Sequence, residues 1–135
     1  MAILVYTESE QGKFKKIAFE VASYARAIAD QNNTTVTAVC INAESPMDLE
    51  IYGVDKILNI SNPDLTTFNA LSYSQSILQA AENENSNIVV ISSSADSRYL
   101  APLLAVKLNA GYVSNASELP SSYKPLICKC SSFNS

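Results

Sequence analysis

The chain contains no histidine among its 135 residues. A serine or cysteine nucleophile paired with histidine needs an imidazole as its base, so both mechanisms are excluded. A zinc site needs about four suitable ligands. Cys128 and Cys130 have no second pair of ligands, and within one strand they would point to opposite faces. We therefore expect no catalytic residue and no metal site.

Glycine is also scarce, with only Gly12, Gly53 and Gly111 in the whole chain. Loops that cradle nucleotide phosphates depend on glycine because the backbone must approach the anion closely. Neither Gly-x-Gly-x-x-Gly nor Gly-x-x-x-x-Gly-Lys-Ser/Thr occurs. The sequence therefore predicts no tight nucleotide site of these two kinds.

Basic residues are in the minority, with 9 against 13 acidic residues and a net charge of −4. This balance argues against a nucleic-acid partner and against a polybasic membrane anchor. No apolar run approaches the roughly 20 residues that span a bilayer, and no basic leader precedes Ile3. Cys40 lies in an apolar run, as a buried thiol of a reducing compartment would. We expect a cytoplasmic protein without membrane insertion.

Four runs rich in apolar and β-branched residues predict strands at 2–6, 34–41, 56–60 and 88–91. The first and the last are continuously apolar, which is typical of parallel strands buried on both faces. A fifth strand is expected to begin at 111–113. Another strand-like run, Leu126-Ile127-Cys128-Lys129-Cys130, comes shortly before the end of the sequence, which suggests a fragment of a longer chain.

Helical periodicity fills the intervals between these strands. Asn32-Asn33 is expected to end the first helix, Ser45-Pro46 to begin a short one with the serine as its cap, and Gly53 to end it. Longer helices are expected from about 67 to 85 and after the serine-rich loop 92–97, where Pro102 limits how early the helix can begin. The expected inner positions are Phe14, Ile17, Ala18, Val21, Ala25 and Ile28, then Ala70, Leu71, Ser74, Ile77, Leu78 and Ala81, then Leu100, Ala101, Leu104, Ala105 and Leu108.

This alternation of strands and helices predicts one α/β domain over residues 1–135. We expect a three-layer α/β/α architecture with a mostly parallel sheet in the order 3-2-1-4-5. Such an arrangement is Rossmann-like, of the adenine nucleotide alpha hydrolase-like type. Helices should cover both faces of the sheet because parallel strands are joined by right-handed crossovers.

One place in this architecture is a candidate anion site. Ligands of open α/β sheets lie at the carboxyl ends of the strands near the switch point, here between the first and fourth strands. The loop 92–97 opens a helix whose N-terminus attracts negative charge, and Arg98 is positioned to pair with an anion. Against this, Glu8 and Glu10 would repel an anion, and Asp96 can cap the helix itself. Of the two readings, a capped loop without a ligand is favoured over a remnant anion site.

Side chains suited to an interface are more prominent than side chains suited to catalysis. The chain has seven tyrosines, whose apolar rings and polar tips favour interfaces. Tyr99 follows Arg98 at a helix start, and these two residues are the predicted interface pair. The acidic pairs Glu82/Glu84 and Asp48/Glu50 are interpreted as solvated surface and helix-dipole partners, so no general acid–base pair is predicted.

Three segments resemble a known family. They are Ile3-Leu4-Val5-Tyr6-x-Glu8 with Gly12-Lys13-Phe14-Lys15-Lys16, then Tyr52-Gly53-Val54-Asp55-Lys56-Ile57, and Ser97-Arg98-Tyr99-Leu100-Ala101-Pro102-Leu103-Leu104-Ala105. The last is similar to a Gly-Arg-Asp-Leu-Ala-Pro-Arg-Leu-Ala-Ala segment of electron transfer flavoprotein alpha subunits. In order and spacing the resemblance to the N-terminal domain of those subunits covers nearly the whole chain. Ser97 and Tyr99 depart from the family's glycine and aspartate, which weakens any role carried over to Arg98.

The resemblance implies a scaffold domain rather than an enzyme. Such alpha subunits form a heterodimer with a beta subunit, and the complex carries electrons from dehydrogenases, including those of fatty-acid oxidation, to a quinone reductase. FAD is held mainly by the C-terminal domain of the alpha subunit, which would be absent here, and the family's structural AMP belongs to the beta subunit. We therefore expect no flavin in this fragment. A stand-alone adenine-nucleotide-binding module, like universal stress proteins, is the alternative, although the loop 92–97 lacks the glycines that those proteins carry.

Overall fold

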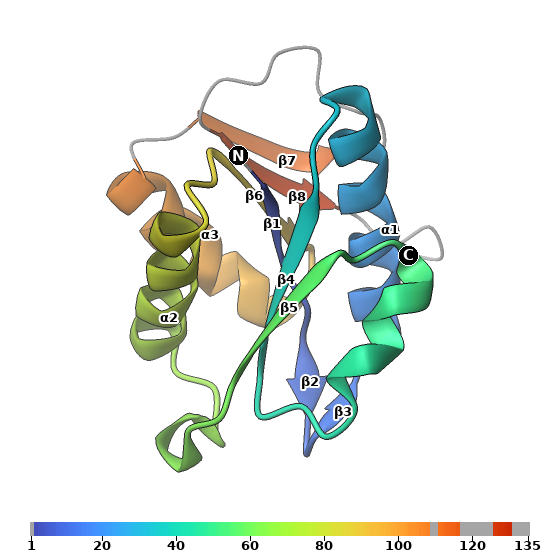
Figure 1. Cartoon of the computed structure of the whole chain (residues 1–135). Helices are drawn as coiled ribbons and strands as arrows, with labels where there is room; N and C mark the ends of the chain where they lie inside the picture. The colour runs from blue at the N-terminus through green and yellow to red at the C-terminus, as the bar shows by residue number, and fades with distance from the viewer. Residues whose placement is uncertain (1, 109–110, 117–125, 131–135) are drawn as a thin grey trace.

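A six-stranded sheet forms the centre of the molecule (Figure 1). The computed structural model describes the backbone of residues 2–108, 111–116 and 126–130 and the side chains of residues 2–107. The strand order is β5-β4-β1-β6-β8-β7, and every recorded pair in this sheet is parallel. The strands are β1 (Ile3–Tyr6), β4 (Val36–Ile41), β5 (Lys56–Ile60), β6 (Ile88–Ser92), β7 (Gly111–Ala116) and β8 (Leu126–Cys130).

The predicted sheet order is correct for four strands and wrong for the fifth. The order 3-2-1-4 corresponds to β5-β4-β1-β6, but β7 does not lie beside β6. The segment Leu126–Cys130 inserts between them as β8, where Leu126 is in register with both Ile88 and Gly111. Sequence neighbours tend to pair in space, but a later strand that can be hydrogen-bonded along both edges is free to take an inner position.

Helices cover both faces of the sheet, as predicted (Figure 1). The helix α1 (Lys16–Gln31) and the 3-10 helix η1 (Pro46–Tyr52) lie on one face, and α2 (Ala70–Asn83) and α3 (Ala95–Leu108) lie on the other. Side chains of β1 alternate between the two layers. Ile3 and Val5 pack in the cluster with α1, whereas Leu4 and Tyr6 pack in the cluster with α2 and α3. All four are buried.

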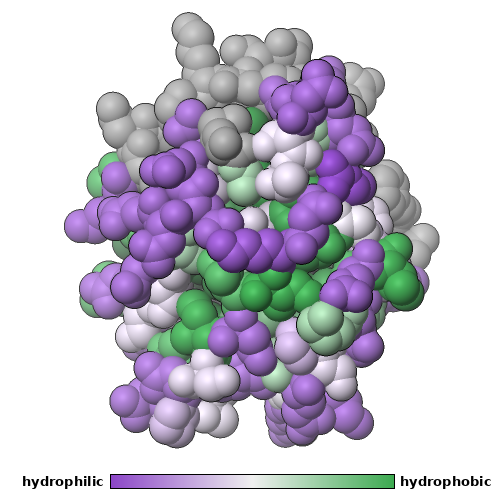
Figure 2. Space-filling model, viewed as in Figure 1, coloured by the Kyte–Doolittle hydropathy of each residue, from purple (hydrophilic) through white to green (hydrophobic). Residues whose placement is uncertain are grey.

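One edge of the sheet is formed by β5. Its apolar side chains Ile57, Leu58 and Ile60 are only half-buried. Apolar atoms accordingly reach the surface in the middle of the face where β5 lies (Figure 2). Among β1, β4, β5 and β6, whose side chains the structure describes, β5 is the least buried strand.

Two helix ends lie where the sequence predicted them, and one predicted helix cap is absent. The chain leaves α1 through Asn32 and Asn33, and Asn33 adopts a φ of 53°. Gly53 closes η1 with a φ of 93°. Both are left-handed conformations that asparagine and glycine tolerate best. The predicted cap at Ser45 is wrong because its side chain makes no capping hydrogen bond; the proline in the first turn defines that start instead.

The inner face of α2 differs from the predicted one. The helix begins at Ala70, where Asn69 accepts a hydrogen bond from the amide of Ser72 at 3.0 Å, and not at residue 67. Leu71 is 57% exposed, while Tyr73 and Ala80 are buried beside Ile77. The predicted inner positions Ser74, Ile77 and Ala81 are buried, so the stripe is correct in part and is wrong at Leu71. Tyr73 and Ala80 complete the inner face, and the Tyr73 ring packs in the cluster on this side of the sheet.

Two further features of the chain were not predicted. The chain forms a small antiparallel hairpin after β1, with β2 (Ser9–Glu10) and β3 (Lys13–Phe14), where the sequence suggested a polar loop. In addition, α3 begins well before Pro102, which lies inside the helix. Burial of Leu100, Ala101 and Leu104 against the sheet stabilises the helix on both sides of the proline, which offsets the hydrogen bond that the proline removes.

Candidate functional site

The switch point of the sheet lies between β1 and β6, as predicted. Beyond β1 the chain turns through the hairpin into α1 on one face, and beyond β6 it turns into α3 on the other face. Ligand sites of open α/β sheets lie at this point because the two loops diverge there. The loops contribute Thr7 to Ser9 from one side and Ser92 to Ser94 from the other.

A carboxylate of the protein itself occupies the switch point. Glu8 is only 2% exposed. Its Oε2 accepts a hydrogen bond from the Ser92 hydroxyl at 2.6 Å, and its Oε1 accepts one from the Ser94 hydroxyl at 2.8 Å. The ammonium of Lys15 lies 3.7 Å from the same Oε1. A buried carboxylate is tolerated when it is both hydrogen-bonded and close to an opposite charge, and Glu8 meets both conditions.

The same hydroxyl of Ser94 begins α3. Its oxygen accepts a hydrogen bond from the amide of Ser97 at 3.2 Å, and the Ser94 carbonyl accepts one from the amide of Arg98 at 3.2 Å. The positive end of the helix is thus linked through one hydroxyl to the carboxylate of Glu8. The loop is capped, as the favoured reading had it, but the cap is Ser94 and not Asp96. From the sequence we expected Glu8 to repel an anion. In the structure, its own carboxylate lies in the position where an anion would bind.

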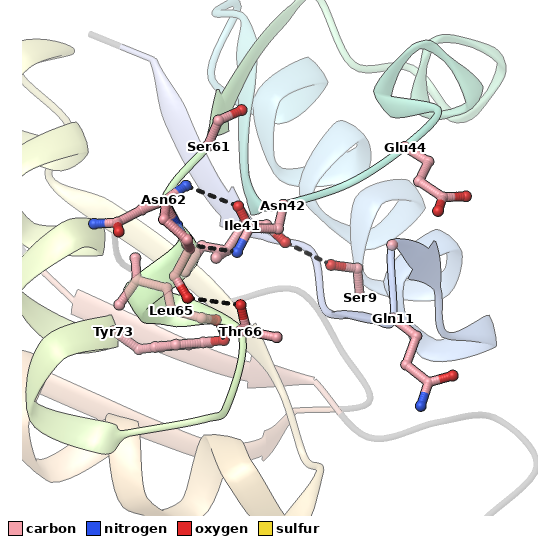
Figure 3. A pocket seen from close by; sticks show the side chains of 12 residues that line it. Ser9, Gln11, Ile41, Asn42, Glu44, Ser61, Asn62, Leu65, Thr66 and Tyr73 are labelled. Atoms are coloured by element: carbon pink, nitrogen blue, oxygen red, sulfur yellow. Dashed lines mark hydrogen bonds between the residues drawn. The ribbon is translucent and has the colours of Figure 1, made fainter.

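A cleft runs along the carboxyl edge of the sheet beside this site. It consists of two adjoining cavities of about 480 and 560 Å³, which share Ser9, Gln11, Thr66 and Tyr73 in their walls. The hairpin forms one wall and the segment 61–68 forms the other (Figure 3). The sequence did not reveal the cleft because these two segments are far apart in the chain.

Hydrogen bonds hold both walls of the cleft in place (Figure 3). The Ser9 hydroxyl donates to the carbonyl of Ile41 at 2.8 Å, which ties the hairpin to β4. The side chain of Asn42 exchanges two hydrogen bonds of 2.8 Å with the backbone of Asn62. These side-chain-to-backbone bonds join segments that are distant in the chain, so the cleft is a preformed feature of the fold.

The predicted interface pair lies outside the cleft. Arg98 and Tyr99 are both exposed, and neither lines the two cavities. Tyr99 is 66% exposed. Pro102 and the 78% exposed Val106 follow at helical spacing on the same face of α3. Arg98 lines neither cavity, so the cleft itself gives no support to the anion-pairing role considered for it.

No group of three or more potential metal ligands comes together in the part of the chain that the structure describes. Within the same residues, no helix is both long enough and apolar enough to cross a membrane.

A family model for the electron transfer flavoprotein domain matches residues 3–135. The match spans nearly the entire chain. The chain belongs to the electron transfer flavoprotein domain family. The resemblance to alpha subunits of this family, drawn from three short segments, is confirmed by relatives of that name.

Curated relatives of this electron transfer flavoprotein domain cover most of the chain. Electron transfer flavoprotein subunit alpha of Bacillus subtilis is 30% identical over 115 residues, which is 84% of this chain and 35% of the relative. The subunit alpha of Thermoanaerobacterium thermosaccharolyticum is 28% identical over 120 residues, or 87% of this chain and 36% of the relative. Protein FixB of Clostridium saccharobutylicum is 26% identical over 119 residues, with the same coverages. The chain spans about a third of the length of these relatives.

The described residues of this electron transfer flavoprotein domain do not fit a flavin dinucleotide at the switch point. A pyrophosphate needs amide or cationic donors, usually at a helix N-terminus. Here the start of α3 already donates to Ser94, which in turn donates to Glu8. The adjoining cavity adds the carboxylates of Glu10 and Asp96. These acceptors would repel a pyrophosphate, so we derive no redox step from this site.

Proposed function

We propose that residues 1–135 act as the N-terminal scaffold domain of an electron transfer flavoprotein alpha subunit. In this proposal the domain packs against a beta subunit, and FAD is held by a C-terminal domain of the complete alpha subunit. The assembled protein carries electrons from acyl-CoA and other dehydrogenases to a quinone reductase or another acceptor in the cytoplasm. The domain itself has no catalytic residue.

The observation that carries this proposal is the occupation of the switch point by Glu8. In an open α/β sheet this is the position where a nucleotide phosphate would bind. A buried carboxylate hydrogen-bonded to Ser92 and Ser94 places acceptors and negative charge at that position. The coverage of about a third of the alpha-subunit relatives further supports the view that the flavin is bound by another part of a longer protein.

The exposed face of α3 supports a role in assembly. Tyr99, Pro102 and Val106 place apolar surface on one side of this helix, and Arg98 lies next to it. Exposed aromatic and arginine side chains are enriched where protein surfaces meet. We propose this face, with the predicted pair Arg98 and Tyr99, as a contact surface for the beta subunit.

Co-purification with the matching beta subunit tests this proposal. The chain should form a one-to-one complex on size exclusion, and Tyr99→Ala should weaken it by about tenfold or more if the ring is a central contact. Leu71→Ala is the matched control, since Leu71 is a similarly exposed apolar residue on α2. Absence of a complex, or an equal effect of both substitutions, would contradict the assigned surface.

A flavin-retention experiment tests the proposal that FAD is held by another domain. The isolated chain, mixed with FAD and desalted, should show no flavin absorbance, whereas stoichiometric flavin would overturn the scaffold assignment. Calorimetry with AMP and ATP addresses the stand-alone adenine-nucleotide module. Micromolar binding would favour that alternative, which the occupied switch point and the glycine-free loop 92–97 argue against.

A further inference from the structure

The larger cavity of the cleft is lined by a buried tyrosine whose hydroxyl has no hydrogen-bond partner among the described residues. Tyr6 ends β1, is 3% exposed, and lines the 560 Å³ cavity. Within the described residues, nothing hydrogen-bonds the Tyr6 hydroxyl, whereas the neighbouring Tyr73 hydroxyl donates to the carbonyl of Leu65. Among the described residues, Ser86 Oγ is the fully enclosed side-chain atom without a partner, so the Tyr6 hydroxyl oxygen is instead open to the cavity. It is therefore available to a group that enters the cavity.

The charges around this hydroxyl indicate the sign of that group. The carboxylates of Glu8, Glu10 and Asp96 line the cavity together with a single ammonium, that of Lys15. The ammonium is shared loosely, at 3.7 Å from Glu8 and 3.9 Å from Asp96. Burial, and then the nearby Glu8, raise the pKa of Tyr6, so its phenol stays neutral and available as an acceptor. The cavity therefore favours a cation over an anion.

The shape and walls of the cavity narrow the class of cation. A volume of about 560 Å³ is far larger than one ammonium needs. Phe68 and Tyr73 form an edge-to-face pair with ring centroids 4.9 Å apart, and both line the cavity. A guanidinium group is planar, stacks on aromatic rings and has five N–H donors for scattered acceptors. The hydroxyls of Thr66 and Thr67 add two more acceptors to the same walls.

We propose that the cavity beside Tyr6 binds a guanidinium group, supplied by an arginine side chain of a partner polypeptide. The cation lies between the Tyr6 hydroxyl and the Asp96 carboxylate, against the Phe68 and Tyr73 rings. Glu8 contributes its charge but no direct contact, because Ser92 and Ser94 already occupy its oxygens. The claim that a partner supplies the arginine rests on the proposed function. The claim that the cavity prefers a guanidinium group does not depend on it.

A substitution of Lys15 tests whether the cavity binds a cation or an anion. The Lys15 ammonium offsets the charge of Glu8 and competes with a bound guanidinium for Asp96, so Lys15→Gln should strengthen binding of a cation. If the cavity instead accepted a phosphate, the same substitution would remove its only lysine and weaken binding. The direction of this single change separates the two readings.

The experiment is a titration of the ¹⁵N-labelled chain with N-acetyl-L-arginine amide, followed by NMR, with N-acetyl-L-citrulline amide as the uncharged control. Arginine amide should shift amides of the hairpin and of residues 66–68 with millimolar affinity, and citrulline amide should not. Asp96→Asn should weaken binding by about two- to fivefold, as expected for a partly exposed charge pair. Glu50→Gln, which removes an exposed carboxylate that lines neither cavity, should leave the affinity unchanged.

Tyr6→Phe distinguishes a binding role from a structural one. The substitution keeps the buried ring and removes only the unpartnered hydroxyl, so it should weaken arginine amide binding without lowering the stability of the fold. Equal binding of arginine and citrulline amides, no binding, or an unchanged affinity in both Tyr6→Phe and Asp96→Asn would overturn the guanidinium site.

The source of the cation is tested separately. A beta subunit that displaces arginine amide supports a partner arginine, and one that binds without displacing it overturns that source. The titration uses the chain alone, so it can show no arginine amide binding even though the complex with the beta subunit forms. Conversely, arginine amide can bind even though no complex forms. The two experiments therefore contradict the guanidinium site and the proposed function separately.

Discussion

The carboxylate of Glu8 accepts a hydrogen bond of 2.6 Å from the hydroxyl of Ser92, although 84 residues separate them in the chain. Glu8 follows the central strand β1, and Ser92 is the last residue of its neighbour β6. The bond joins the two loops that diverge at the switch point. The carboxylate of Glu8 thus occupies the position of a bound anion, and we expect its removal to change the stability of the fold.

Replacement of Glu8 should destabilise the fold. Glu8→Ala leaves the buried hydroxyl of Ser92 without its carboxylate acceptor and exposes the start of α3 to an empty space, at a cost of about 2 kcal/mol in the free energy of unfolding. Glu8→Gln keeps one acceptor oxygen and should cost less. Urea denaturation measures both changes. The control Glu10→Ala, at an exposed hairpin position, should remain within about 0.5 kcal/mol of the parent; equal losses in all three variants would contradict the role of Glu8.

Stability should fall in acid partly through Glu84. The ammonium of Lys56 and the hydroxyl of Thr37, each at 2.8 Å, hold the pKa of Glu84 below its ordinary value of 4.5. A carboxyl whose pKa is lower in the folded state stabilises the fold above its unfolded pKa, and this contribution is lost as the pH falls through the folded pKa. The stability difference between the parent and Glu84→Gln should therefore be full at neutral pH and shrink below pH 4.5. A difference that is constant with pH would refute the linkage.

Protonation of Asp55 should also lower the stability of the fold in acid. The backbone amide of Val36 and, after it, the guanidinium of Arg26 lower the pKa of Asp55 from its ordinary value of 3.8. Since the side chain is 46% exposed, solvent screening keeps its share small. Asp55→Asn retains an acceptor for Val36, so it should reduce the pH dependence below pH 3.8 while costing little stability at neutral pH.

The hairpin turn should require a glycine at position 12. Gln11 and Gly12 connect β2 to β3 with φ angles of 52° and 83°, the two-residue turn in which both positions are left-handed. Gly12→Ala should destabilise the fold by about 1 kcal/mol, because alanine is strained at this φ. Its added Cβ would also lie 2.5 Å from Cγ of Glu44. Gln11→Gly, which removes strain at the adjacent position, should not destabilise by more than about 0.5 kcal/mol, and thermal unfolding compares the two.

Cys40 should not react in the native protein. It is buried in β4, and burial raises the pKa of its thiol to about 12, which leaves almost no thiolate at neutral pH. Mass spectrometry after brief alkylation should find Cys40 unmodified in the folded chain and fully modified in denaturant. Rapid modification under native conditions would mean that β4 opens far more readily than its central position in the sheet suggests.

Much of the architecture was predictable from local patterns. Continuous apolar runs gave β1 and β6 because a strand buried on both faces has no exposed polar side to encode. Asn33 and Gly53 marked helix ends because few other residues adopt a positive φ at low cost. The place of β8 between β6 and β7 was not predictable, since any apolar run of similar length would satisfy the same local pattern.

The amino-acid sequence by itself determined the α/β class, the family, and the lack of a histidine-based or glycine-rich site, because these depend on residue types and spacing. Only the tertiary structure decided that the carboxylate of Glu8 is buried and hydrogen-bonded instead of exposed in a polar loop. Charge is encoded in one residue, but its electrostatic effect depends on the groups that surround it. Those groups, Ser92 and Ser94, reach Glu8 only when parallel pairing brings β6 beside β1.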